Sequence, residues 1–168
     1  AAHPQCLRTL TLIEPGAYQL LQEASRANLW LDFLQVMDDF TRTTAEGDPG
    51  TAWAMYFDTY CSHVGAWHTL PATMREAILQ KTPVQLRVYG AQVSNPTRLS
   101  HIRALTCPTL VIHGQKSRQP EQVICKLIAA NAPLGRISEV PEAGHMVPLT
   151  HAQGVAELLR TLFGQHGI

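Results

Sequence analysis

The sequence has few charged residues, only 15% of its 168 residues against roughly 25% in an average soluble domain. Lysine plus arginine and aspartate plus glutamate both number 13, so the formal net charge is zero. A nucleic-acid-binding protein needs a basic excess to displace counterions from phosphates, so this composition argues against that class. No apolar run reaches the ~18 residues that span a bilayer, and no charged segment followed by an apolar stretch opens the sequence. We therefore expect no membrane segment, no signal peptide and a cytoplasmic location.

Residue pairs at the spacings of metal sites or disulfide scaffolds are also absent. The four cysteines, Cys6, Cys61, Cys107 and Cys125, are scattered and form no C-x-x-C pair. The histidines form no H-x-H or H-x-x-x-H pair. We therefore expect reduced and mostly buried thiols, and neither a metal nor a cofactor. The length suits one domain with a single core.

The order of secondary-structure signals indicates an α/β fold. Alternation predicts a strand over Leu7–Ile13, and the short apolar run Thr109–Ile112 predicts a strand buried on both faces. A third strand is predicted over Arg136–Val140, with a helix from Pro120 before it and another after the loop Glu142–Leu149. This order requires a parallel sheet of about three strands, flanked by helices and joined by right-handed crossovers.

The segment between the first two strands, residues 17–105, has a helical pattern. One apolar helical face is formed by Leu29, Phe33, Val36, Met37 and Phe40. Asp48, which precedes a proline, is typical of a helix N-cap. In the last helix, Thr150 and Gln153 predict an N-terminal capping box, and Gly164 is the predicted C′ residue.

The loop Pro141–Met146 (PEAGHM) holds the strongest candidate for chemistry. It follows the third predicted strand, at the edge where open α/β sheets bind ligands. Gly144 permits a sharp turn that would project His145 over this edge. An imidazole there can act as a general base near neutral pH, although a Gly-His pair in a loop is by itself more often structural.

Two long segments, CPTLVIHG and EVPEAGHMVPLTHAQGVAELLRTLF, closely resemble the C-terminal part of the α/β-hydrolase superfamily. HPQCLRTLTLIEP is similar to the sixth strand of that superfamily, and FDTYCSHVGAWHTLP to the helical cap of one bacterial branch. The resemblance covers nearly the whole chain. It implies a partial α/β-hydrolase fold, with a core of residues 1–16 and 106–168 and a helical cap insertion of residues 17–105. It also implies that His145 is the catalytic base.

The superfamily's nucleophile and oxyanion hole have no counterpart in this sequence. The nucleophile lies on a G-x-S-x-G turn that precedes the sixth strand, and no such turn is present. The nearest similarity, CSHVG around Ser62, lacks the first glycine and falls in a helical region, so Ser62 is not expected to act. The resemblance therefore implies ester or similar acyl hydrolysis, for which this chain alone would be inactive.

The acid partner of His145 departs from the usual pattern as well. The superfamily usually places it as G-x-x-D after the preceding strand, where this chain has Ser117, followed by the cation Arg118. Some relatives, including a group of haloalkane dehalogenases, carry the acid at the end of the sixth strand, where Glu14 stands. Parallel strands lie ~5 Å apart, so a carboxylate there could reach the imidazole. Glu14 is therefore either the catalytic acid or a solvated strand-end carboxylate or helix cap.

The remaining histidines and aromatic residues fit structural roles. His113 is expected to pack at a strand end, and the others have no metal spacing: His63, His68, His101 and His151. The aromatic residues of the helical segment could line a substrate pocket, but their helical spacing favours a plain core: Trp30, Trp53, Tyr56, Phe57 and Trp67.

The first strand should need a partner. A strand without a neighbour leaves unpaired N–H and C=O groups, each of which costs about 1–3 kcal/mol if buried. We therefore expect the Leu7–Ile13 edge to be covered by a second copy, by a chain carrying the missing N-terminal half, or by a rearranged cap. The low charge fraction agrees with a partly covered surface.

Two hypotheses follow for the function. In the first, the chain is the C-terminal part of a hydrolase and contributes His145 and Glu14. In the second, it is a non-catalytic truncated module that forms homo-oligomers or binds a small-molecule ligand or another protein. An in-frame G-x-S-x-G upstream of Ala1 is expected on the first hypothesis, and a start codon on the second.

Overall fold

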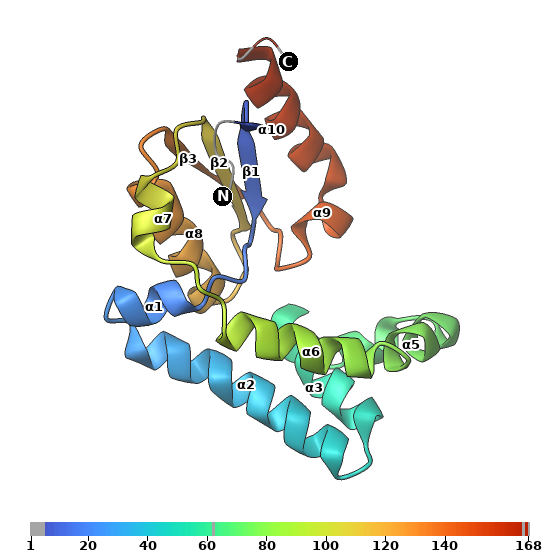
Figure 1. Cartoon of the computed structure of the whole chain (residues 1–168). Coiled ribbons are helices and arrows are strands. Elements are labelled where there is room, and N and C mark those ends of the chain that lie inside the picture. Colours follow the sequence, from blue (N-terminus) through green and yellow to red (C-terminus); the bar gives the residue numbers. More distant parts are fainter. Residues whose placement is uncertain (1–5, 62, 166, 168) are drawn as a thin grey trace.

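Three parallel strands form one sheet in the order β1-β2-β3 (Figure 1). The computed structural model describes residues 6–61, 63–165 and 167. The strand bounds are Leu10–Ile13 for β1, Thr109–Gly114 for β2 and Gly135–Val140 for β3. The register places Leu12 beside Val111, and Val111 beside Ile137. The predicted α/β class with a three-stranded parallel sheet is confirmed, and all three strands end at the same edge.

β1 is shorter than the predicted Leu7–Ile13 because β2, the strand it pairs with, begins only at Thr109. The ladder starts at Leu10, whose N–H donates to the carbonyl of Pro108 (2.9 Å), rather than at Leu7. Pro108 has no N–H to donate to the residues before Leu10, so the ladder stops there. At the other end, β2 runs to Gly114, past the predicted Ile112, because its last residues still pair with β3.

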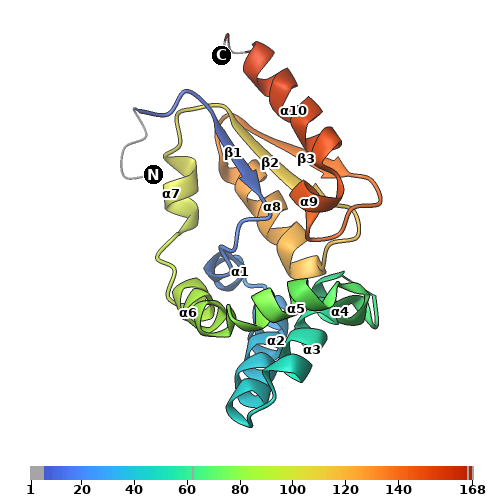
Figure 2. The same cartoon turned by 90° about the vertical axis from the view of Figure 1, so that its right-hand side faces the viewer.

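Helices cover both faces of the sheet, α7 and α8 on one side and α9 and α10 on the other (Figure 1, Figure 2). Their bounds are Leu99–Arg103 for α7, Gln119–Asn131 for α8, Val147–Thr150 for α9 and Ala152–Gln165 for α10. Alternate residues of β2 serve the two faces. Val111 packs in one cluster with Ile124 and Ile128 of α8, whereas Ile112 packs in another with Val155 of α10. Every residue of β2 is buried, which explains its apolar run.

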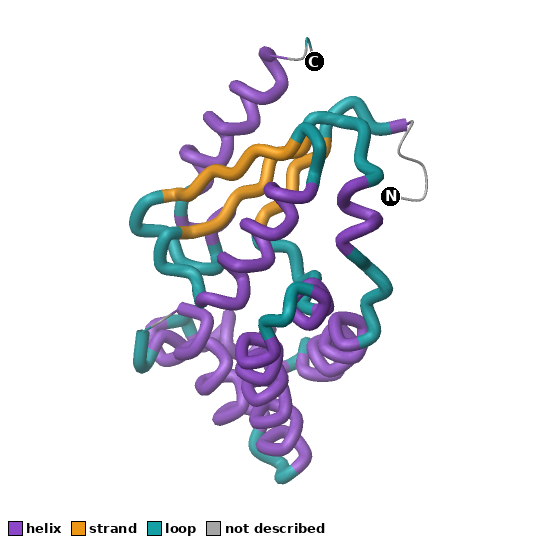
Figure 3. The backbone as a smooth tube through the Cα atoms, turned by 90° about the vertical axis from the view of Figure 1, so that its left-hand side faces the viewer, coloured by secondary structure: helices purple, strands orange, loops and turns teal. Residues whose placement is uncertain are grey.

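The helices between β1 and α7 form a layer beyond the carboxyl edge of the sheet (Figure 1, Figure 3). The bounds in this helical layer are Gln19–Glu23 for α1, Ala27–Ala45 for α2, Pro49–Cys61 for α3, Ala66–Thr69 for α4, Ala72–Leu79 for α5 and Thr82–Val93 for α6. Phe40, Trp53 and Trp67 are buried in a core of its own, and Trp53 Nε1–H donates to the Thr82 hydroxyl (2.9 Å). The other aromatic residues weighed as pocket lining pack against this or the main core: Trp30, Tyr56 and Phe57.

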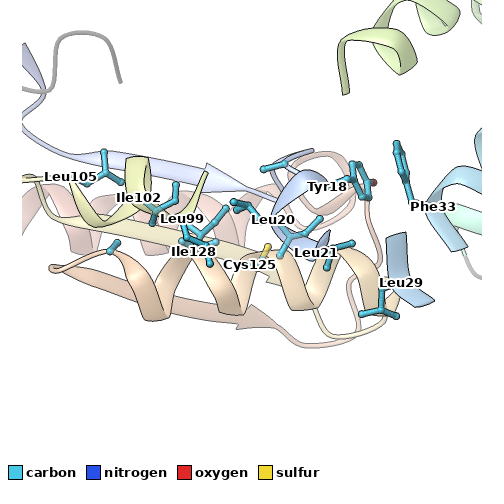
Figure 4. Packing of buried hydrophobic residues seen from close by; sticks show 14 of the residues in the cluster. Tyr18, Leu20, Leu21, Leu29, Phe33, Leu99, Ile102, Leu105, Cys125 and Ile128 are labelled. Carbon is cyan, nitrogen blue, oxygen red and sulfur yellow. The ribbon is translucent and has the colours of Figure 1, made fainter. Parts of the chain in front are cut away.

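One apolar cluster joins the helical layer to the sheet (Figure 4). The Tyr18 ring, at the start of α1, stacks on Phe33 of α2 with centroids 3.6 Å apart. Leu20 and Leu21 of α1 lie beside Cys125 of α8, as Figure 4 shows. The cluster therefore fixes the helical layer against α8, and α8 in turn against β2.

The predicted helix ends are partly right. Asp48 is an N-cap, and its Oδ1 accepts the N–H three residues further on (2.9 Å). The capping box of Thr150 and Gln153 is wrong, because Thr150 ends α9 and its hydroxyl donates to the carbonyl of Met146, the residue before that helix (3.1 Å). His151 has a non-helical φ of −132°, so it separates helix α9 from helix α10. Gly164 is not a C′ residue either, since α10 continues through it.

Two further expectations concern the burial of the thiols and the absence of a membrane segment. Cys107 and Cys125 are buried, but Cys6 and Cys61 are exposed, and all four are free, so only half of the thiols are buried as expected. Among the described residues, no helix combines the length and apolar character that crossing a membrane requires.

β1 is an edge strand. Within the described ranges it pairs only with β2, so the other side of its backbone has no ladder. An open groove of about 550 Å³ lies beside it, lined by apolar residues of β1, α7 and α8 and the segment after α7: Leu10, Leu12, Ile102, Leu105 and Ile128. These five residues define the edge groove.

Candidate active site

The segments that follow the three strands meet at the carboxyl edge of the sheet. Glu14 directly follows β1, Ser117 lies in the turn after β2, and His145 lies in the loop after β3. Because parallel strands end at one edge, Glu14 and His145 meet although 131 positions separate them.

The Glu14 carboxylate accepts three hydrogen bonds. Oε1 accepts from the Gly114 backbone N–H (2.8 Å) and from the Ser117 hydroxyl, and Oε2 accepts from Nδ1 of His145. The side chain is only 2% exposed, so these donors replace the water that would otherwise solvate it. Glu14 is therefore neither a solvated carboxylate nor a helix cap.

The backbone of Glu14 explains how its side chain reaches across the sheet. The Glu14 N–H donates to the carbonyl of Ile112 (3.0 Å), so the hydrogen bonds between β1 and β2 continue to the residue just after β1. Its φ of 42° lies in the left-handed region, which is uncommon for a residue other than glycine. The side-chain hydrogen bonds hold this conformation in place.

The His145 imidazole is oriented by Glu14. A carboxylate can only accept, so Nδ1 carries the proton and Nε2 of the neutral ring carries the lone pair. Within the described part of the chain, no hydrogen bond is made to Nε2. The Tyr60 ring packs on the imidazole with centroids 4.9 Å apart, and the side chain is 24% exposed. Nε2 is therefore the atom of this pair that can exchange a proton with a ligand.

The loop that carries His145 turns at a different residue from the one expected. Glu142 has a left-handed φ of 61°, whereas Gly144 has no positive φ, so the prediction of a turn at Gly144 is wrong. The N–H of Glu142 donates to Gln115 Oε1 (3.2 Å), and its carboxylate binds Lys116 Nζ (2.6 Å). The Lys116 ammonium lowers the pKa of Glu142. These contacts tie the His145 loop to the turn after β2, which compensates for a glutamate in this conformation.

A largely buried polar cluster of Tyr18, Tyr60, Arg118 and Glu121 supports the imidazole through the Tyr60 ring. The Tyr18 hydroxyl donates to Glu121 Oε1 (2.6 Å) and lies 3.4 Å from the Tyr60 hydroxyl. The Arg118 guanidinium lies over the Tyr60 ring, 5.1 Å from its centroid. The cluster therefore fixes the ring that packs on His145.

Burial controls protonation in this polar cluster. It raises the pKa of Glu121, and it raises the pKa of Tyr60 to about 12. Burial likewise raises the pKa of Tyr18, so both tyrosines stay neutral at physiological pH. Arg118 also forms a 2.6 Å ion pair with Asp32 of α2, which ties the helical layer to α8.

Sequence reasoning missed most of this polar cluster. In the sequence, Arg118 stands out only as a cation that cannot replace a missing acid. The one signal available was the i,i+3 spacing of Arg118 and Glu121 at the start of α8. Nothing in the sequence indicates that Tyr18 and Tyr60, 42 positions apart, meet beside them.

The other residues considered for the site have structural roles or lack an activated nucleophile. His113 is 2% exposed, and its Nδ1 lies 3.0 Å from the carbonyl of Gly114, as expected for a packed strand-end histidine. Ser62 lies outside the described residues. Burial and, to a lesser degree, Asp58 raise the pKa of the Cys61 thiol, which disfavours the nucleophilic thiolate. No group of His, Cys, Asp and Glu side chains within the described ranges could hold a metal ion.

No protein-family model matches the chain, and no curated protein matches it. A carboxylate–imidazole pair with a free Nε2 can take a proton from a hydroxyl or a water molecule and return it to a leaving group. The described residues supply this base but no activated nucleophile beside it.

Proposed function

We propose that this chain is the C-terminal part of an α/β-hydrolase-like enzyme that hydrolyses esters or similar acyl compounds. His145 is the general base, Glu14 is the acid that orients it, and the helical layer is the cap over the site. The nucleophile comes from a segment or a chain outside these 168 residues. One observation carries the proposal: Glu14 binds Nδ1 of His145 at the carboxyl edge of the sheet, and Nε2 is left for chemistry.

In this mechanism the nucleophile's hydroxyl gives its proton to Nε2 while its oxygen attacks the carbonyl carbon of the ester. Glu14 stays ionised and stabilises the imidazolium that forms. His145 then protonates the departing alkoxide, which leaves as an alcohol and leaves an acyl-enzyme behind. The same base activates a water molecule that releases the carboxylic acid and restores the hydroxyl. The Tyr60 ring shields the imidazole, and lower local polarity strengthens its bond to Glu14.

We place this activity in the cytoplasm. Cys6 and Cys61 are free and exposed. Exposed thiols remain unpaired in a reducing compartment and tend to oxidise outside it.

The test compares the 168-residue chain with the longer protein read from the coding sequence upstream of it. The 168-residue chain is expected to show no turnover of p-nitrophenyl esters and no labelling by a fluorophosphonate. The longer protein, carrying a G-x-S-x-G, is expected to do both. There, His145→Gln should lower kcat by on the order of 10⁶-fold, because the nucleophile loses its base.

His151→Gln is the matched control for this loss. The His151 imidazole lies at the surface, where its Nδ1 is 2.9 Å from the Thr150 hydroxyl, so its replacement should leave kcat unchanged. Labelling of the 168-residue chain, or full activity of His145→Gln in the longer protein, would contradict the proposal.

The edge groove favours a second candidate function, a non-catalytic module that assembles with a second copy of itself. The free side of β1 presents unpaired backbone groups next to an apolar groove. Both can be covered at once if two copies pair along β1 and fill each other's grooves. In this candidate the Glu14–His145 pair has a structural role only.

Light scattering on the purified chain tests the second candidate, which expects a dimer at micromolar concentration. Leu10 and Glu14 donate to β2, and alternate residues of a strand donate to the same neighbour, so the Thr11 N–H faces the free side. Thr11→Pro removes that donor without breaking the β1–β2 ladder and is expected to give monomers. Circular dichroism verifies that the variant is folded. A well-behaved wild-type monomer would exclude this candidate.

A further inference from the structure

Ser117 is a buried residue whose hydroxyl has no step in the mechanism above. It is 5% exposed and lies in the turn between β2 and α8. Its N–H donates to the carbonyl of Gly114 (3.2 Å), and its own carbonyl accepts from Gln122 Nε2 (2.8 Å). The backbone is therefore held on both sides, which fixes the position of the hydroxyl.

The hydroxyl of Ser117 is directed at Glu14 and not at the helix that follows. No side chain caps α8, whose N-cap residue is Arg118. The Ser117 hydroxyl instead donates to Oε1 of Glu14, the oxygen that also accepts the Gly114 N–H (2.8 Å). A hydrogen bond to a charged acceptor is worth more than one to a neutral carbonyl.

The two oxygens of Glu14 thus have different partners. Oε1 is anchored by two donors from the β2 end, whereas Oε2 meets only His145 among the described residues. Rotation of the carboxylate would exchange the two oxygens and break both anchors. The anchors therefore keep one carboxylate oxygen in line with Nδ1.

We propose that Ser117 is a positioning residue: its hydroxyl, with the Gly114 N–H, holds the Glu14 carboxylate so that Oε2 stays on Nδ1 of His145. This rests on the proposed function, in which that pair is the base. Without the hydroxyl, Glu14 keeps a single anchor, its side chain gains freedom to rotate, and Nε2 loses its fixed direction. A second carboxylate at this position would repel Glu14, which explains why a neutral donor suits it.

The test follows the proton between Nδ1 and Oε2 by proton NMR of the 168-residue chain. A low-field resonance that disappears in His145→Gln is expected in the wild type. Ser117→Ala should speed its exchange with water about tenfold or more, because a hydrogen bond to a charged group is lost. Ser117→Thr keeps the hydroxyl and should restore slow exchange. Ser138→Ala, which removes a hydroxyl of β3 that is not bonded to Glu14, is the control and should change nothing.

An unchanged exchange rate in folded Ser117→Ala would overturn the proposal, as would a wild-type chain without a resonance that depends on His145. A folded Ser117→Thr that behaves like Ser117→Ala would overturn it too. If Ser117→Thr does not fold, the comparison of Ser117→Ala with Ser138→Ala decides. The resonance requires no nucleophile, so missing esterase activity in the longer protein would refute the proposed function and leave this result standing. In an active longer protein, Ser117→Ala should lower kcat while KM is unchanged.

Discussion

Replacing Glu14 by alanine is expected to lower the free energy of unfolding of the 168-residue chain by about 3–5 kcal/mol. The Gly114 N–H, the Ser117 hydroxyl and the His145 Nδ1–H all lose their acceptor. Each donor left buried without a partner costs about 1–3 kcal/mol. Urea unfolding followed by tryptophan fluorescence measures the change.

Glu142→Ala is the matched control. Both glutamates have a left-handed φ, 42° and 61°, and both carboxylates have a partner at the same edge of the sheet. They differ in exposure, because the side chain of Glu142 is 71% exposed and water can replace its contact with Lys116. Its replacement should therefore leave stability close to that of the wild type. Equal effects of the two substitutions would show that burial of Glu14 does not set its contribution.

The pairing of Glu14 with His145 is the part of the site that the sequence could suggest. Each residue lies just beyond a predicted strand, and the strand order requires a parallel sheet, whose strands end at one edge. Sequence spacing could not choose between a paired and a solvated Glu14. The choice depends on the φ of Glu14 and on the donors of Gly114 and Ser117, which only the folded backbone brings together.

The polar cluster could not be predicted, because it depends on how helices from distant parts of the chain pack. Tyr18 precedes α1, Tyr60 lies in the last turn of α3, and Glu121 lies in the first turn of α8. Only the stacking of Tyr18 on Phe33 and the packing of α1 on α8 bring the hydroxyl of Tyr18 to the carboxylate of Glu121. Periodicity places each residue on a helix but gives no crossing angle between helices.

Local signals did not decide the conformation at three positions near helix ends and turns. Thr150 and Gly164 have strong end-of-helix preferences, yet one closes α9 and the other lies inside α10. Glu142, and not Gly144 two residues further on, takes the left-handed conformation because Gln115 and Lys116 hold it there. Such preferences amount to about 1 kcal/mol, which a few hydrogen bonds can offset.

Replacing Gly114 by alanine is expected to lower the free energy of unfolding by about 1–3 kcal/mol or more, as overpacking does in a rigid site. A Cβ at this position would lie 2.3 Å from the Ala143 carbonyl oxygen and 2.7 Å from that of Gly144. Both oxygens belong to the backbone of the loop that carries His145, so the whole loop must shift away from β2. The same shift should pull the imidazole off Glu14, and the low-field proton resonance of His145 should disappear with the loss of stability.

Gly90→Ala in α6 separates this steric effect from the general effect of replacing glycine. Nothing lies within 4 Å of a Cβ added at Gly90, and alanine favours a helix over glycine by roughly 0.5–1 kcal/mol. That variant should be at least as stable as the wild type and keep the His145 resonance. If Gly114→Ala matched it in both respects, the His145 loop would not pack on the end of β2. The close approach of these two backbones is what brings an imidazole from β3 to a carboxylate from β1, because Gly114 lies between them and donates its N–H to the same carboxylate.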